Sequence, residues 1–305
     1  MLRYALRRCA TVPLTLLVIV TLSFFTMRLA PGGPFDAEQA LSAQVKANLR
    51  AAYGLDQPLP VQYLHYLWGV LHADFGPSLR MRDLAVSQLI AQGLPISATL
   101  GACAILLALL TGLTLGIAAA VRGRSLARLA GGWSILSVAL PSFVVGPFLA
   151  LLFGVELQWL PAAGWQLDVA HLVLPVVTLA LPVSAYIARL TRDSLGEVLA
   201  QDFVRTARAK GLAPARILFA HALPPALLPV LSYLGPATAA VVTGSLVVET
   251  VFGLPGAGRY LVQGALDRDY PLVMGMVVVY GLITLMANLA ADLLYGWLDP
   301  RLRHG

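Results

Sequence analysis

Charge and cysteine are both scarce in this chain of 305 residues. Asp, Glu, Lys and Arg together make up 12% of it, whereas 58% of the residues are hydrophobic. Soluble domains have about a quarter charged and about half apolar residues, so this composition excludes an ordinary soluble protein and predicts an integral membrane protein. The only two cysteines, Cys9 and Cys103, exclude a disulfide framework and a cysteine metal cluster.

Catalytic and metal-binding motifs are also missing. The five histidines are scattered, with no His-Glu-x-x-His spacing, and the sequence has no Gly-x-Ser-x-Gly motif. Residues 253–258 have the glycine spacing of a phosphate-binding loop, but Arg259 and Tyr260 follow where Lys and Ser or Thr would be needed. We therefore expect no enzyme activity, no metal and no cofactor in this chain, and any ATP must be hydrolysed by another chain.

Long apolar runs dominate what is present. A helix rises about 1.5 Å per residue and must cross about 30 Å of hydrocarbon, which takes about 20 residues. Six runs qualify: 9–29, 96–121, 131–155, 170–187, 226–252 and 271–298. The first follows Arg3, Arg7 and Arg8 as in a signal peptide, but it is too long and no cleavage site follows it. The expected fold class is an all-α polytopic membrane protein with six transmembrane helices, the first of them uncleaved.

The distribution of arginine and lysine predicts the orientation of these spans. Six spans return the chain to its starting side, and positive residues concentrate on the cytosolic side of membrane proteins. Fourteen Arg and Lys lie on the N-terminal side and seven on the other, although the polar stretches of the other side are longer overall. The N-terminal side carries Arg3, Arg7, Arg8, Arg122, Arg124, Arg128, Arg189, Arg192, Arg205, Arg208, Lys210, Arg216, Arg301 and Arg303. We expect a cytoplasmic (inner) membrane protein with both termini in the cytosol.

The one long polar region, residues 30–95, predicts a small helical insert on the outer side. Ser42 can cap a helix that stops at Gly54, and Pro60 can open a second helix whose apolar residues share one face. That face could rest on the membrane surface or on the bundle. We therefore divide the chain into residues 1–95, the first span with its insert, and residues 96–305, a five-helix core that includes a cytosolic loop at 193–225.

Prolines and glycines within the apolar runs indicate either static kinks or helices that pivot. Each proline removes a backbone hydrogen bond, which lipid tolerates only where a neighbour satisfies the freed group. They are Pro141, Pro147, Pro175, Pro182, Pro229 and Pro236. Gly112 and Gly116 form a small-xxx-small pair that predicts close approach of two helices.

Two carboxylates inside the spans are candidates for the translocation path. Glu249 lies near the outer end of the fifth run and Asp292 in the inner half of the sixth. An ionisable residue in lipid indicates function by default, but both lie near an interface, where a structural role is equally open.

A polar stretch at 202–225 interrupts the apolar second half, and it predicts two short helices joined at a hinge. Gly211 can take the left-handed C-terminal cap, Pro214 can start the next helix, and Pro224 and Pro225 can end it. Arg205, Arg208 and Lys210 give the stretch a positive edge. It could offer this edge to a cytosolic partner or only fix the topology of the spans.

This stretch resembles the cytoplasmic loop of binding-protein-dependent ABC import permeases. That loop reads Glu-Ala-Ala, three residues, Gly, nine residues, Ile-x-Leu-Pro. Here Gly211 is followed nine residues later by His221-Ala222-Leu223-Pro224, whereas Arg205-Thr206-Ala207 replaces Glu-Ala-Ala and His221 replaces Ile. The form RTARAKGL is similar to the peptide branch of the family, and MRLAPGGPF at 27–35 and TGSLVVETVFGLPG at 243–256 favour its oligopeptide members.

The resemblance implies a type I importer permease core in a larger complex. The partners would be a second, homologous permease, two ABC ATPase subunits that bind ATP and Mg²⁺, and an extracytoplasmic peptide-binding protein. The loop would couple the spans to the ATPase through Asp202, Arg205, Thr206, Ala207, Arg208, Lys210, Gly211, His221, Leu223 and Pro224. One alternative is a dipeptide or nickel/metallophore permease. Another is a stand-alone proton-coupled secondary transporter, which would need a carboxylate or histidine relay at the middle of the membrane and internal inverted repeats. Neither feature is evident in the sequence.

Overall fold

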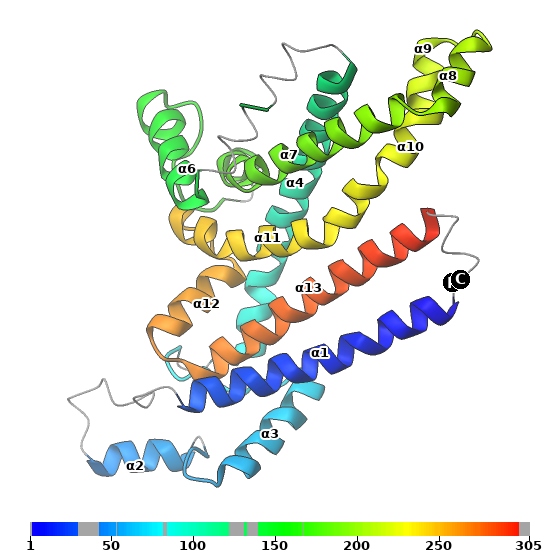
Figure 1. The fold of residues 1–305 in the computed structure, drawn as a ribbon. Helices are drawn as coiled ribbons and strands as arrows, with labels where there is room; N and C mark the ends of the chain where they lie inside the picture. The colour runs from blue at the N-terminus through cyan, green and yellow to red at the C-terminus, as the bar shows by residue number, and fades with distance from the viewer. Residues whose placement is uncertain are drawn as a thin grey trace. The chain divides into compact units, whose positions relative to one another are not determined.

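Helices account for all the regular structure of the described residues. The computed structural model describes residues 2–29, 43–52, 54–81, 84–121, 131–132, 140–166 and 168–298. Its helices, labelled in Figure 1 except for the π-helices η1 and η2, are α1 (Leu2–Leu29), α2 (Ala43–Ala52), α3 (Leu59–Leu71), α4 (Val86–Val121), α6 (Ser142–Leu149), η1 (Ala150–Glu156), α7 (Ala170–Leu199), α8 (Asp202–Ala209), α9 (Pro214–Arg216), η2 (Ile217–Ala222), α10 (Leu223–Ala226), α11 (Leu228–Phe252), α12 (Ala257–Leu266) and α13 (Tyr270–Leu298). The predicted all-α class is confirmed.

Five of the described helices are long and apolar enough to cross a membrane: α1, α4, α7, α11 and α13. They correspond to the first, second, fourth, fifth and sixth predicted spans. The predicted third span, 131–155, falls partly outside the described residues. Its described part is the shorter apolar helix Ser142–Glu156, made of α6 and η1.

Two spans extend further than their apolar runs. α4 begins ten residues before position 96 and holds Pro95 inside it. α7 continues to Leu199, so Arg189 and Arg192 lie within the helix and not after it. The sequence-based prediction ended this span at residue 187, just before the charged side chains of Arg189 and Arg192. The helix goes on because Leu195 and Val198 keep its buried face continuous beyond that point.

The prolines divide into two groups that the sequence pattern did not separate. Pro141 is the N-cap of α6 and Pro229 lies in the first turn of α11, where no intrahelical hydrogen bond is lost. The prediction that each proline breaks a helix hydrogen bond is wrong for these two. Pro147, Pro175, Pro182 and Pro236 do lie inside helices.

The contacts divide the chain into two compact units. One consists of residues 1–9, 97–254 and 284–305, and the other of residues 10–96 and 255–283. In the first unit α7 packs against α6 and α11, and Leu100, Leu179, Ile187, Val241 and Val248 are among its buried core residues. The sequence-based division at residue 95/96 stays a prediction about domains.

α4 and α7 approach each other closely at the predicted glycine pair. A Cβ atom on Gly116 would lie 2.6 Å from the Thr191 Cβ, and one on Gly112 would lie 2.8 Å from the Ile187 Cβ. No real Cβ fits at such distances, so the prediction of close helix approach at these glycines is confirmed.

In the second unit, a buried carboxylate ties residues 78–80, which follow α3, to the start of α13. Asp269 is fully buried and accepts hydrogen bonds from the Ser78 hydroxyl and from the backbone N–H groups of Leu79 and Arg80. Its other oxygen accepts the N–H of Leu272 at 3.3 Å, so Asp269 also caps α13. One side chain therefore holds two segments that are far apart in sequence.

α3 turns its two tyrosines toward α1 and leaves most of its apolar stripe exposed. Tyr63 and Tyr66 pack against Phe24 of α1, whereas Leu64, Trp68 and Leu71 are exposed. The predicted apolar face of this helix therefore does not rest on the described helices of its own unit.

Candidate functional site

The stretch at 202–225 folds as a compact hairpin that joins the end of α7 to the start of α11 (Figure 1). Its first arm is α8, and its second arm is the continuous helical segment of α9, η2 and α10. The two predicted short helices are thus present.

Gly211 ends the first arm in the predicted left-handed conformation, with φ of +75°. The Gly211 N–H donates to the Arg208 carbonyl at 2.9 Å, and the Leu212 N–H donates to the Ala207 carbonyl at 3.3 Å. This pair of hydrogen bonds is the Schellman motif, which satisfies carbonyls that the end of a helix leaves open. The bend is therefore fixed by backbone hydrogen bonds that require a left-handed residue at position 211.

The prediction that Pro224 and Pro225 end the second helix is wrong. The chain stays helical from Pro214 to Ala226, because the π-helix η2 is followed directly by α10. Pro224 and Pro225 lie in the first turn of α10, where a missing N–H costs little. The change of helical register at η2 is what accommodates two consecutive prolines here.

One face of the hairpin is its own small core. Val204 and Ala207 of α8 are buried against Ile217 of η2, with Leu199 and Leu212 beside them. Ala207, predicted as a coupling residue, therefore serves the internal packing of the hairpin. This contact, together with the cap at Gly211, holds the two arms against each other.

The opposite face carries most of the other predicted residues in exposed positions. Arg205 pairs with Asp202 at 3.2 Å, and the Thr206 hydroxyl donates to the Asp202 carbonyl at 2.9 Å. The exposed set is Asp202, Arg205, Thr206, Arg208, Lys210, Gly211, His221 and Pro224, while Leu223 is half-buried. The hairpin thus brings eight of the ten predicted residues to its surface, five of them on α8 or its cap residue.

The hairpin is anchored to the ends of two spans. Ala222 and Ala226 pack with Leu195 and Val198 of α7, and Ile117 and Ala120 of α4 lie against the same cluster. Small residues at positions 222 and 226 let the second arm lie close to α7. A displacement of the hairpin would therefore be passed directly to α4 and α7.

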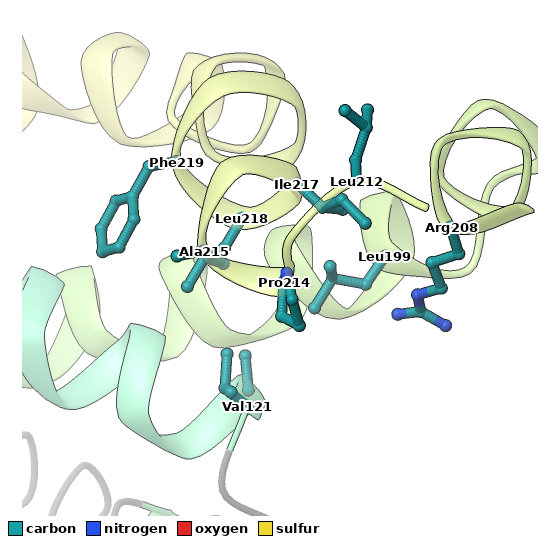
Figure 2. Close-up of a pocket in the computed structure, with 10 residues that line it drawn as sticks. Val121, Leu199, Arg208, Leu212, Pro214, Ala215, Ile217, Leu218 and Phe219 are labelled. Carbon is teal, nitrogen blue, oxygen red and sulfur yellow. The ribbon is translucent and has the colours of Figure 1, made fainter. Parts of the chain in front are cut away.

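A pocket of about 630 Å³ opens between the hairpin and these two helices. Figure 2 shows Pro214, Leu218 and Phe219 on the hairpin side, with Val121 and Leu199 on the facing helices. Its walls are apolar apart from Arg208, the charged side chain on its lining. The pocket lies next to the surface that carries the predicted coupling residues.

Sequence reasoning missed two exposed aromatic side chains on the hairpin. Phe203 has 44% and Phe219 has 61% of its surface exposed. Large exposed apolar side chains on a hairpin between two spans suit a protein contact. The signal for Phe203 was available, because it precedes the buried Val204 and so lies off the apolar face of α8.

The two carboxylates predicted within the spans lie in different surroundings. Glu249 is fully buried and accepts a hydrogen bond from the Ser97 hydroxyl at 2.6 Å. Asp292 is partly exposed and pairs with Arg8 at 3.1 Å. Their role in a translocation path stays a prediction. Within the described ranges, no three His, Cys, Asp or Glu side chains lie together as metal ligands would.

Comparison with protein families matches nearly the whole chain. Residues 112–304 match the family "binding-protein-dependent transport system inner membrane component", and residues 1–81 match the N-terminal model of the same transport-system membrane components. The oligopeptide transport system permease protein OppB of Salmonella typhimurium is 48% identical over 306 residues, covering 100% of both chains. The dipeptide transport system permease protein DppB of Bacillus subtilis is 42% identical, covering 99% of this chain and 98% of that one.

Solved structures agree on the fold. A chain of the MetNI methionine ABC transporter in an inward-facing conformation aligns with a TM-score of 0.58 at 18% identity, covering 70% of this chain and 97% of its own. A chain of an amino acid ABC transporter aligns with a TM-score of 0.51 at 20% identity, covering 68% of this chain and 94% of its own. The sequence matches and the all-helical fold lead to one conclusion: this chain belongs to the family of binding-protein-dependent transport system inner membrane components.

Proposed function

We propose that this chain is a permease subunit of an ATP-driven importer that carries oligopeptides across the cytoplasmic membrane. The observation that carries the proposal is the 48% identity to an oligopeptide permease along the full length of both chains. The exposed, rigidly capped hairpin supports the coupling role that such a subunit needs.

The proposed partners are a second, homologous permease, two ATPase subunits and an extracytoplasmic binding protein. ATP and Mg²⁺ would be held by the ATPase subunits. Both termini and the hairpin would lie in the cytosol, in line with the excess of arginine and lysine on that side.

In this mechanism the hairpin transmits the closure of the ATPase pair to the spans. Arg205, Arg208 and the exposed Phe203 offer charge and apolar area to a groove on the ATPase. The Val204–Ala207–Ile217 core keeps the hairpin rigid, so a push on its surface moves it as one body. Its packing on α7 and α4 carries the motion into the membrane. The shift between inward and outward access is limited by the differential affinity of ATP for the two states.

Reversing two charges on the hairpin tests the proposal. The variant Arg205→Glu with Arg208→Glu should abolish uptake of labelled peptides in a deletion strain, because docking of the ATPase is lost, while the amount of chain in the membrane stays unchanged. Arg268→Glu, an exposed arginine outside the hairpin, is the control and should retain uptake.

Two other results would contradict the proposal. Normal uptake by the doubly reversed variant would rule out the coupling role. Uptake driven by this chain alone in vesicles, against a gradient and without an ATPase, would favour a proton-coupled transporter.

Uptake of peptides of graded length tests the substrate. Uptake of dipeptides only would favour the alternative function of a dipeptide permease, which the 42% identical relative supports.

A further inference from the structure

Arg28, in the last turn of α1, lies over two aromatic rings. Its guanidinium carbon is 5.4 Å from the centroid of the Phe24 ring and 5.9 Å from that of Tyr270, the first residue of α13. Aromatic faces attract a cation at these distances. The two rings therefore hold the guanidinium in place from the start of α13 and from the preceding turn of α1.

Among the described residues, however, no acid pairs with the charge of Arg28. In the part of the chain that the structure describes, Arg28 forms no ion pair, and its Nε–H is buried without a hydrogen-bond partner. Other arginines differ: Arg8 pairs with Asp292, and the Arg80 Nε–H donates to the Asp267 carbonyl at 2.9 Å. Buried polar groups in folded proteins are nearly always hydrogen-bonded, so an unmet donor on a cation indicates a missing acceptor.

A second donor without a partner belongs to the same aromatic cluster. Tyr66 stacks on Phe24 with ring centroids 5.8 Å apart, and its hydroxyl is buried without a hydrogen bond. The neighbouring Tyr63 hydroxyl, by contrast, is bonded to the Thr21 hydroxyl at 2.6 Å. Burial raises the pKa of Tyr66, so at neutral pH its hydroxyl keeps its proton and remains a donor.

The chemistry of these groups selects the ligand. A planar guanidinium presents paired N–H donors that match the two oxygens of a carboxylate. We propose that Arg28, oriented by Phe24 and Tyr270, binds a carboxylate at the end of α1, beside the aromatic cluster that also holds the Tyr66 hydroxyl. Given the proposed function, on which the source of the ligand rests, the carboxylate is either the C-terminus of the peptide or an acidic side chain of the binding protein.

Direct binding tests the site without reference to transport. The purified full chain in detergent is heated with acetyl-Gly-Gly, which has a free carboxylate, and with the amide of the same peptide. The free acid should raise the melting temperature of the wild type and the amide should not. Arg28→Gln should weaken binding of the acid about tenfold or more, the range expected for hydrogen bonds to a charged group.

Two matched variants separate a specific site from other effects. Arg28→Lys keeps the charge over the rings but loses the planar fork, so it should bind the acid more weakly than the wild type. Arg268→Gln removes an exposed arginine from the same unit and should leave binding unchanged. A purely structural Arg28 would alter the melting temperature without ligand, but not its dependence on the free acid. If the acid stabilises Arg28→Gln as much as the wild type, or does not stabilise the wild type, the site does not exist.

Uptake by the complete importer identifies the source of the carboxylate. If the ligand is the peptide C-terminus, Arg28→Gln should lower uptake of free-acid peptides and spare C-terminally amidated ones. If the ligand is an acidic side chain of the binding protein, Arg28→Gln should lower the uptake of free-acid and amidated peptides equally. The binding protein should then also dissociate more readily from the variant importer. If the wild type takes up no peptide while acid-dependent binding persists, the proposed function fails and the carboxylate site stands.

Discussion

At the residue scale, single positions in the hairpin have separable physical roles. Gly211 supplies a left-handed backbone, Ala207 fills the internal core, and Arg205 and Arg208 lie on the exposed side. The motif therefore combines residues that shape the hairpin with residues that can contact a partner. Substitutions should distinguish the two groups, because the first changes stability and the second changes coupling.

Gly211→Ala should destabilise the protein by about 1 kcal/mol, because an L-residue is disfavoured in the left-handed conformation. No atom lies within 4 Å of the position that a Cβ would occupy, so the cost comes from the backbone and not from a clash. Thermal unfolding of the purified chain measures the effect.

Gly196→Ala is the matched control for this substitution. Gly196 is exposed within α7, a Cβ there also meets no atom within 4 Å, and its backbone is helical. Alanine should stabilise this position by up to about 1 kcal/mol, since it is the better helix former. Equal effects of the two substitutions would show that the left-handed backbone is not what position 211 requires.

At the scale of elements, contacts between helices decide where close packing is obligatory. α4 and α7 touch at Gly112 and Gly116, whereas Gly101 of the same α4 has ordinary van der Waals space, with the Val241 Cγ1 atom at 3.5 Å. The small-xxx-small spacing thus marks the helix pair on which the hairpin is also anchored.

Gly116→Ala should cost about 1–3 kcal/mol, the usual penalty for overpacking, because its Cβ would lie 2.6 Å from the Thr191 Cβ and 2.7 Å from the Ala188 carbonyl oxygen. Gly101→Ala should not destabilise the protein and should gain up to about 1 kcal/mol, since alanine is the better helix former and its Cβ meets only an ordinary contact. Thermal stability in detergent compares them, and a tolerated alanine at position 116 would mean that α4 and α7 pack more loosely than described here.

At the scale of the whole molecule, the apolar helices leave much of their surface to be covered by lipid or by other subunits. Only 11% of the apolar window of α1 is buried within the chain, compared with 50% for α7. α7 is therefore the more buried of the two helices, and α1 depends more on its surroundings. A chain with this distribution is stable only in a bilayer or in a complex.

The proposed topology predicts opposite accessibility for two exposed positions. In a background with Cys9→Ser and Cys103→Ala, a membrane-impermeant maleimide should label Lys210→Cys only in inside-out vesicles. It should label Arg268→Cys only in intact spheroplasts. The excess of positive charge on the N-terminal side gives this expectation its physical basis. Labelling of position 210 from outside would overturn both the topology and the coupling role.

Local chemistry was enough to predict the membrane class, most helices and the cap at Gly211. Hydrophobic length and the backbone freedom of glycine act within one element, so a linear pattern reveals them. It did not reveal that α7 continues past Arg192, that Pro224 and Pro225 lie inside a helical arm, or that Glu249 is bonded to Ser97. It also could not show that Arg28 of α1 meets Tyr270. Those outcomes depend on contacts between residues far apart in the sequence, and only the folded chain brings these residues together.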